Sequence, residues 1–144
     1  ANIASYFLPE NLSVLTYEDK DGNKYSAEKT KKCDKYEFNS ITVLLNGNSA
    51  SASEIYASAM QDHGIGMVVG TQTYGKGVVQ SVFDLKDGTC LKLTVSEYFT
   101  PNGRTIHEEG VKPDVEVEYE VDVENPEKDN QLEKAIEVIN EHFK

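Results

Sequence analysis

The fold of this 144-residue chain is constrained most by two short apolar runs, Ile41-Thr42-Val43-Leu44-Leu45 and Met67-Val68-Val69-Gly70. Both are rich in β-branched residues, which is typical of strands buried on both faces of a sheet. From the first run the chain passes through Asn46-Gly47-Asn48 into a predicted helix that ends near His63-Gly64, where the glycine provides a C-terminal stop. Strand, helix and strand therefore predict a βαβ unit.

The rest of the sequence predicts further strands and helices around this unit. One turn falls at 19–23, where Gly22 fits a left-handed position, and another at Lys86-Asp87-Gly88. Asn130 is positioned to cap a final helix. The expected elements are the end of a helix at 1–8, extended segments at 12–18 and 24–28, strands at 78–85, 91–99 and 115–119, and a helix with an apolar stripe of Leu132, Ile136, Ile139 and Phe143. We therefore expect one α/β domain with a mixed β-sheet and packed helices.

Composition excludes several classes of function. The net charge is −11, whereas a nucleic-acid partner needs clustered Lys and Arg, so we expect no nucleic acid to bind. Apolar residues make up 38% of the chain, which indicates a folded domain rather than disorder. No apolar run is long enough to span a bilayer. The three histidines lack metal-ligand spacing, and neither a metal nor another cofactor is implied.

The two cysteines and the first residue give weaker information. Cys33 and Cys90 form neither a metal-binding set nor a disulfide framework. We expect two separate thiols, with a single bridge between them as the alternative. Because the chain begins at Ala1 without a signal peptide, we expect it to be a section of a longer protein. The missing targeting signal therefore says nothing about where that protein resides.

A cluster of serines marks the start of the predicted helix, between Asn48 and Glu54. The simplest interpretation is that small residues let helix and sheet pack closely and that one serine caps the helix. The first turn of a helix also offers unpaired N–H groups that can hold a developing oxyanion. Ser51 is then a better nucleophile than Ser49, because the Ala52 N–H is the next donor along the chain. The Gly-x-Ser-x-Gly elbow of α/β-hydrolases is not met.

A glycine-flanked lysine follows the second apolar run, in Gly70-Thr71-Gln72-Thr73-Tyr74-Gly75-Lys76-Gly77. Its first seven residues match a phosphate-binding loop. The match then fails, because Gly77 has no hydroxyl for Mg²⁺ and residues 78–82 read as a strand where a phosphate loop needs a helix. We therefore expect no nucleotide to bind.

The same lysine fits the role of a general base for a serine nucleophile. A lysine can act in this way when burial destabilises its ammonium group. Gly75 and Gly77 allow a tight turn around Lys76. Strand alternation places Lys76, Val78 and Gln80 on one side, so Gln80 could orient the lysine amine; a surface glutamine is the alternative.

The sequence closely resembles the carboxy-terminal processing proteases, the tail-specific Ser/Lys peptidases of family S41. The resemblance rests on 46–55, Gln61-Asp62-His63-Gly64, 70–77 with Gln80, and Thr100-Pro101-Asn102-Gly103-Arg104 with 110–114, which cover nearly the whole chain in the right order. It implies a ClpP/crotonase-like core, with Ser51 as the nucleophile, Lys76 as the general base and Gln80 in support. The position matching Asp62 is important in some members. From the residues alone, Asp62 is either the polar end of its helix or an anchor for a neighbouring loop.

The resemblance also implies that residues 1–144 form only the C-terminal part of a catalytic domain. Members of the family have a PDZ domain and an upstream glycine whose N–H is a second oxyanion donor beside Ala52, and neither belongs to this sequence. We expect the isolated chain to be inactive or nearly so, because losing one such donor costs about 10²–10³ in rate. The implied substrates are proteins cut near their C-termini. The implied parent protein is extracytoplasmic, periplasmic or at the cell surface, and anchored to a membrane.

Other interpretations of these residues remain open. The chain could be a non-catalytic peptide-binding module that retains the protease fold, although the intact Ser51 and Lys76 pair argues against it. Ser26-Ala27-Glu28-Lys29 spells the Ser-x-x-Lys of penicillin-binding enzymes, but the segment is predicted to be a strand and the companion motifs are missing. His63 is expected to interact with the C-terminus of its helix. The oligomeric state is not predicted.

Overall fold

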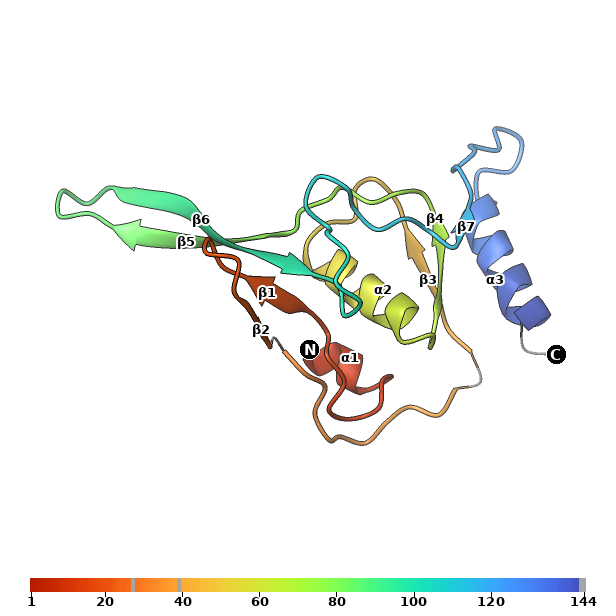
Figure 1. Cartoon of the computed structure of the whole chain (residues 1–144). Coiled ribbons are helices and arrows are strands. Elements are labelled where there is room, and N and C mark those ends of the chain that lie inside the picture. Colours follow the sequence, from red (N-terminus) through yellow and green to blue (C-terminus); the bar gives the residue numbers. More distant parts are fainter. Residues whose placement is uncertain (27, 39, 143–144) are drawn as a thin grey trace.

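The computed structural model describes residues 1–26, 28–38 and 40–142 and arranges them in four layers (Figure 1). The first layer is an antiparallel sheet whose strands follow the order β2 (Lys24–Ser26), β1 (Thr16–Glu18), β6 (Cys90–Phe99) and β5 (Val78–Asp84). Helix α2 (Ala52–Asp62) is the second layer. The third is a parallel sheet of β3 (Thr42–Leu45), β4 (Met67–Gly70) and β7 (Val115–Glu116), and the fourth is α3 (Asn130–His142). The predicted α/β class is confirmed, with antiparallel and parallel pairing separated into two sheets.

The predicted βαβ unit is present. Strands β3 and β4 pair in parallel, with Val43 opposite Val68, and α2 connects them. The helix ends at the C-cap residue His63, followed by Gly64 with φ +65°. Burial differs between the two strands: Val68 is fully buried, whereas Leu44 is 40% exposed. The expectation of burial on both faces is wrong for β3, because β3 lies at the edge of its sheet and β4 lies in the centre.

Helix α2 is buried between the two sheets. Ala57 packs with Leu45 and Val68 of the parallel sheet. On the other side, Ile55 packs against Leu15 and Tyr98 in the antiparallel layer. A short helix, α1 (Asn2–Ser5), covers the C-terminal half of α2 with a third apolar cluster of Ala4, Leu8, Val14, Ala59 and Met60. The N-terminus of α2 therefore lies where elements from both sheets meet.

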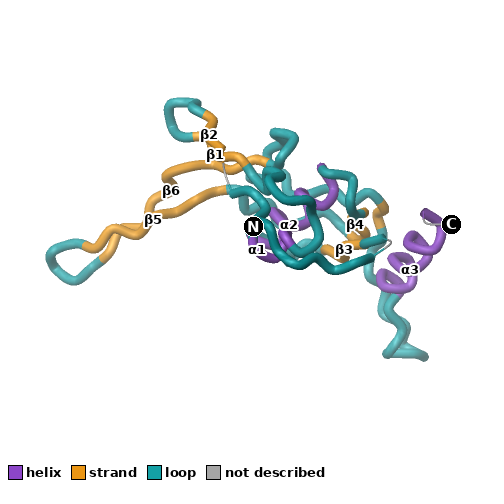
Figure 2. Tube along the Cα trace, turned by 90° about the horizontal axis from the view of Figure 1, so that it is seen from below, coloured by secondary structure: helices purple, strands orange, loops and turns teal. Residues whose placement is uncertain are grey.

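Strands β5 and β6 form a long hairpin that projects from the rest of the molecule (Figures 1 and 2). Its far half carries several exposed apolar side chains, which are Val82, Phe83, Leu85, Leu91 and Leu93. The near half joins β1 and thereby the core. Only this near half positions residues of the site described below. None of the helices in the described residues is long and apolar enough to cross a membrane.

The C-terminal helix differs from its sequence prediction. Residues Ala135 and Val138 are buried against Val69, whereas Leu132 and Ile136 are 47% and 51% exposed. The predicted stripe is therefore wrong, because the helix turns its smaller residues towards the close-packed sheet; Phe143 of that stripe lies outside the described residues.

The cap of this helix is also different from the prediction. The Asp129 carboxylate accepts from the N–H groups of Gln131 and Leu132, both at 3.0 Å. Asn130 is already in the helix, and its side-chain amide donates to the carbonyl of Glu118 at 2.7 Å. Asp129 is therefore the capping residue, and Asn130 fastens the segment after β7 to the helix.

Candidate active site

Ser51 lies at the junction between β3 and α2, as the N-cap residue of the helix. Its backbone has φ 56° and ψ −112°, a conformation that non-glycine residues rarely adopt and that costs about 1–3 kcal/mol. A serine on a strained strand-to-helix turn is the backbone geometry of a nucleophile elbow. The structure thus provides the elbow although the sequence lacks its glycine pattern.

The first turn of α2 presents one free N–H group beside this serine. Ala52 is exposed, and no described residue accepts a hydrogen bond from its N–H group. The Ser51 N–H is occupied, because it donates to Oε2 of Glu54 at 2.7 Å. Ala52 therefore offers the unpaired helix-terminal donor that an oxyanion needs next to Ser51.

Glu54 is fully buried and joins the serine turn to the lysine turn. Its Oε1 accepts from the Thr73 hydroxyl and from the Gly75 N–H at 2.6 Å. Its Oε2 accepts from the Ser51 N–H at 2.7 Å and the Lys76 N–H at 3.0 Å. All these partners are donors, as an ionised carboxylate requires. One buried side chain thus fixes the backbone at both predicted catalytic residues.

The 105–111 loop holds the lysine turn from its other side. The Glu108 N–H donates to the carbonyl of Gly75 at 2.9 Å. A Cβ atom added to Gly77 would lie 2.3 Å from the backbone nitrogen of His107. Only glycine permits this approach of two backbones, which explains the glycines that flank Lys76 in the sequence.

Thr73 connects this loop to Glu54. Its hydroxyl accepts from the Val111 N–H at 2.7 Å while donating to the Glu54 carboxylate. Its own N–H donates to the Val111 carbonyl at 3.2 Å. The lysine turn is therefore fixed between α2 and the 105–111 loop by backbone contacts, and its position does not depend on the Lys76 side chain.

The Lys76 side chain itself is exposed. A lysine that acts as a general base has to be desolvated, and the described part of the chain does not bury Lys76. Its position next to the Ser51 turn is set by the shared contact with Glu54. Any desolvation of this amine has to come from groups that bind over it.

Gln80 is also exposed, and its amide Nε2 lies 3.4 Å from the Thr94 hydroxyl on β6. Strand β5 begins at Val78, after Lys76, and its register shifts between Val79 and Gln80. The shift leaves Val95 of β6 without a partner on β5, so the extra residue lies on β6 and does not test the alternation expected along β5. The supporting role of Gln80 stays a prediction.

Asp62 anchors a loop. Its side chain is 3% exposed and accepts from the Asn102 N–H at 2.8 Å and from the Arg104 guanidinium. The same guanidinium donates to Gln61 Oε1 at 2.8 Å. Of the two sequence interpretations, the structure favours the loop anchor: Asp62 ties the end of α2 to the segment that continues into the 105–111 loop. It lies at the opposite end of α2 from Ser51.

Two residues of this arrangement, Glu54 and Tyr98, were missed by sequence reasoning. Ser51-Ala52-Ser53-Glu54 fits the capping-box pattern, which could have identified Glu54 as a partner of the Ser51 N–H. Tyr98 is 4% exposed, and its hydroxyl donates to the carbonyl of Lys76. No local pattern indicates that contact, because it depends on how β6 crosses behind the lysine turn.

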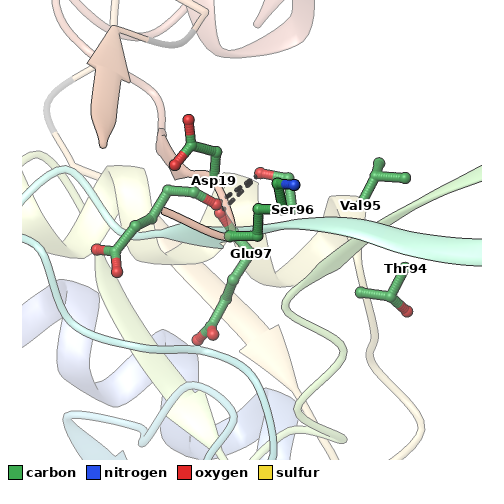
Figure 3. A pocket seen from close by; sticks show the side chains of 7 residues that line it. Asp19, Thr94, Val95, Ser96 and Glu97 are labelled. Carbon is green, nitrogen blue, oxygen red and sulfur yellow. Dashed lines mark hydrogen bonds between the residues drawn. The ribbon is translucent and has the colours of Figure 1, made fainter. Parts of the chain in front are cut away.

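Other polar groups lie away from this site. A shallow pocket of about 240 Å³ between β1 and β6 is lined by Glu18, Asp19, Lys20 and 94–97, and the Ser96 hydroxyl donates to the Glu18 carbonyl there at 2.8 Å (Figure 3). His63 contacts the Ser13 carbonyl through Nε2 at 2.7 Å. Cys33 and Cys90 are free thiols, so the single-bridge alternative is wrong. Among the described residues, no three metal-ligating side chains gather at one place.

Comparisons with known sequences agree with one another. The family model described as Peptidase family S41 matches residues 1–117. A "Probable CtpA-like serine protease" of Staphylococcus haemolyticus is 34% identical over 115 residues, which is 80% of this chain and 23% of that protein. A "Carboxy-terminal-processing protease" of Bartonella bacilliformis is 50% identical over 78 residues, which is 54% of this chain and 18% of that protein. The chain thus spans about a fifth of the length of these relatives.

Solved structures show the same relationship. The photosystem II D1 C-terminal processing protease matches with a TM-score of 0.70 and 36% identity, over 85% of this chain and 32% of that one. An S41 protease structure from Bacteroides fragilis matches with a TM-score of 0.71 over 99% of this chain and 41% of that one, and at 15% identity it shows the shared fold alone. By sequence match and by fold, the chain belongs to peptidase family S41.

Proposed function

We propose that this chain carries the catalytic serine and lysine of a serine endopeptidase that processes proteins near their C-termini. The observation that carries the proposal is the Glu54 carboxylate, which fixes the backbones of Ser51 and Lys76 through one oxygen atom. The strained Ser51 backbone and the unpaired Ala52 N–H support it. The names of the relatives give the class of substrate.

The chemistry follows acyl transfer. Neutral Lys76 takes the proton from Ser51 Oγ as that oxygen attacks the scissile carbonyl carbon. The Ala52 N–H stabilises the negative charge that forms on the carbonyl oxygen. The lysine ammonium then gives its proton to the leaving amine, and the C–N bond breaks to leave an acyl-enzyme. Water attacks this ester with Lys76 again as the base, and Ser51 is regenerated.

Because Lys76 is exposed, this mechanism requires that something cover its amine before the reaction. A lysine amine is neutral near physiological pH only when its ammonium form is desolvated. Strand β5, which follows the lysine turn, is an edge strand of its sheet. An extended peptide added to that edge would cover Lys76 and present its carbonyl to Ser51. Substrate binding would then supply the desolvation, with Gln80 on β5 supporting the amine.

The remaining parts of the proposal concern a longer protein. A second oxyanion donor and a PDZ domain would come from segments outside this sequence, so the 144-residue chain alone would have little activity. We also propose an extracytoplasmic, membrane-anchored parent protein, on family resemblance. No cofactor takes part in the steps above.

A second candidate function is peptide binding without catalysis. The exposure of Lys76 favours it, because a solvated ammonium is not a base. The free edge of β5 would serve a binding module equally well. The two functions differ in whether Ser51 and Lys76 are needed for anything beyond binding.

The test measures cleavage of an unfolded reporter protein by the longest gene product that contains this chain. Ser51→Ala and Lys76→Ala should each abolish cleavage while leaving reporter binding intact. Ser53→Ala and Lys86→Ala are the matched controls, at exposed positions whose side chains take part in none of the contacts described above, and should keep full activity. Full activity in either Ser51→Ala or Lys76→Ala would remove that residue from the mechanism. Binding without any cleavage in the unmodified protein would favour the second candidate.

A further inference from the structure

Tyr98 lies behind the lysine turn, in the part of β6 that joins the core. Its side chain is 4% exposed and belongs to the apolar cluster with Leu15 and Ile106. Its backbone N–H donates to the carbonyl of Gly77 at 2.9 Å. Its hydroxyl is therefore held at a fixed place by a strand and by a packed ring.

The hydroxyl of Tyr98 is directed at the residues of the proposed mechanism. It donates to the backbone carbonyl of Lys76. Together with the backbone bond to Gly77, this contact fixes two successive carbonyl groups of the lysine turn. The peptide that carries Lys76 is thus held at its N–H end by Glu54 and at its carbonyl end by Tyr98.

The Ser51 side chain completes this arrangement. Burial raises the pKa of Tyr98, and a hydrogen bond with the Ser51 side chain partly offsets that rise. The phenol is therefore protonated across the neutral range and remains a donor to Lys76. Its oxygen can at the same time accept from the Ser51 hydroxyl. The hydroxyl is thus bonded to the lysine half of the site, and the Ser51 side chain lies close enough to affect its pKa.

We propose that Tyr98 is a positioning residue of the Ser51 and Lys76 site, and that its hydroxyl sets the separation and angle between nucleophile and base. This inference rests on the proposed function. Glu54 holds the Lys76 N–H group and the 105–111 loop holds the Gly75 carbonyl, but neither contact reaches the carbonyl of Lys76. The Tyr98 hydroxyl is the donor to that carbonyl, so it fixes the direction of the peptide that follows Lys76.

The phenol oxygen, and not the ring, is the part that matters for this role. In Tyr98→Phe the ring still fills the apolar cluster, while the Lys76 carbonyl loses its donor in a partly buried place. The turn then either leaves the carbonyl unpaired or shifts to find another partner. Either change moves Lys76 relative to Ser51, and a displacement of about 1 Å can cost up to about a hundredfold in rate.

The experiment compares Tyr98→Phe with Tyr17→Phe in the longest gene product that contains the chain. Tyr17 lies opposite Tyr98 in the β1–β6 register and packs against the same cluster from a partly buried position, so the two substitutions remove the same hydroxyl group from neighbouring rings. We expect Tyr98→Phe to lower kcat about tenfold with KM nearly unchanged, and Tyr17→Phe to alter neither. Ser51→Ala and Lys76→Ala are measured beside them.

A readout independent of catalysis accompanies the kinetics. Hydrogen exchange of the peptide that spans 75–78 should become faster in Tyr98→Phe than in Tyr17→Phe, because the lysine turn has lost an anchor. Equal kcat in the two tyrosine variants, with Ser51→Ala and Lys76→Ala inactive, would overturn the positioning role and leave the proposed function standing. Unchanged exchange at 75–78 would overturn it whether or not the protein is a peptidase. A reduced amount of folded protein with normal kcat per folded molecule would show a purely structural tyrosine and would also overturn it.

Discussion

Ser51 and Lys76 donate their backbone N–H groups to the same oxygen atom, Oε2 of Glu54, at 2.7 and 3.0 Å. The two residues come from different turns, one after β3 and one after β4. Their relative position is thus set by the backbone and a buried carboxylate, and not by contact between their own side chains. The contacts of Ser51 and Lys76 with the Glu54 carboxylate use only backbone N–H groups, so the two backbones are fixed while their side chains are left free to react.

The first prediction concerns that carboxylate. Glu54→Gln replaces an acceptor-only group with one that has a single acceptor oxygen and an NH₂ group facing donors. At least one of the N–H groups of Ser51, Gly75 and Lys76 loses its partner in a buried place. We expect a loss of about 3 kcal/mol in the free energy of unfolding. Urea denaturation measures it, with Glu116→Gln at an exposed position of β7 as the control.

Substitution of the reactive side chains should change the free energy of unfolding much less than Glu54→Gln does. Lys76→Ala removes no contact that the backbone uses, so it should unfold within about 0.5 kcal/mol of the unmodified protein. Ser51→Ala removes the capping-box acceptor at the start of α2 and should lose about 1 kcal/mol. A large destabilisation in either variant, comparable to Glu54→Gln, would contradict the separation between the fixed backbones and the reactive side chains.

The local elements could be predicted from the sequence because their signals are local. The two continuous apolar runs correctly indicated β3 and β4, and the serine-rich start and the stop at Gly64 correctly indicated α2. The packed face of α3 could not be predicted in the same way. Leu132 and Ile136 are more apolar than Ala135, yet Ala135 is the residue buried against Val69, because the face that α3 turns to the sheet is set by tertiary packing and not by the apolar character of single residues.

In the site, too, residues marked by a local sequence pattern could be predicted, whereas contacts between distant segments could not. Ser51 and Lys76 were candidates because each follows a strand at a glycine-rich turn. Glu54, Thr73 and Tyr98 act through contacts between segments that are distant in sequence. The register shift opposite Gln80, where β6 carries the extra residue Val95, also had no sequence signal. Side-chain chemistry was predictable here, whereas the partners of each side chain were not.

A second prediction tests the close approach of two backbones at the lysine turn. Gly77→Ala places a Cβ atom 2.3 Å from the backbone nitrogen of His107, so the 105–111 loop has to move. We expect a loss of at least about 2 kcal/mol in unfolding free energy, together with loss of activity. Gly47→Ala is the control, because a Cβ there meets only the Gln72 carbonyl at 3.9 Å. Equal stability of the two variants would show that the loop does not hold the lysine turn.

A third prediction concerns the anchor at the far end of α2. Asp62→Ala leaves the Asn102 N–H without its acceptor and the Arg104 guanidinium with Gln61 alone, at a position where the Asp62 side chain is 3% exposed. We expect about 2 kcal/mol of destabilisation, which is less than for a fully buried pair because Arg104 is 45% exposed. Glu137→Ala removes the exposed pair with Lys134 and should change the melting temperature little. A destabilisation of similar size in both would mean that the 101–104 turn is held by other contacts.

The last prediction concerns alkaline pH. Burial raises the pKa of Tyr98 and of Tyr56 above their ordinary value near 10. In the unfolded chain both phenols ionise near pH 10, whereas in the folded protein they stay protonated to higher pH. Their contribution to stability is therefore complete below pH 10 and is lost as the pH rises through their folded pKa values.

Unfolding free energies measured between about pH 8.5 and 11.5 should fall less steeply in Tyr98→Phe than in the unmodified protein, by at most about 1.4 kcal/mol per pH unit. Ile106→Val weakens the same apolar cluster without removing a titrating group, so it should lower stability equally at every pH. If Tyr98→Phe also shifts the curve by a constant amount with no change of slope, the Tyr98 phenol is not held protonated by burial.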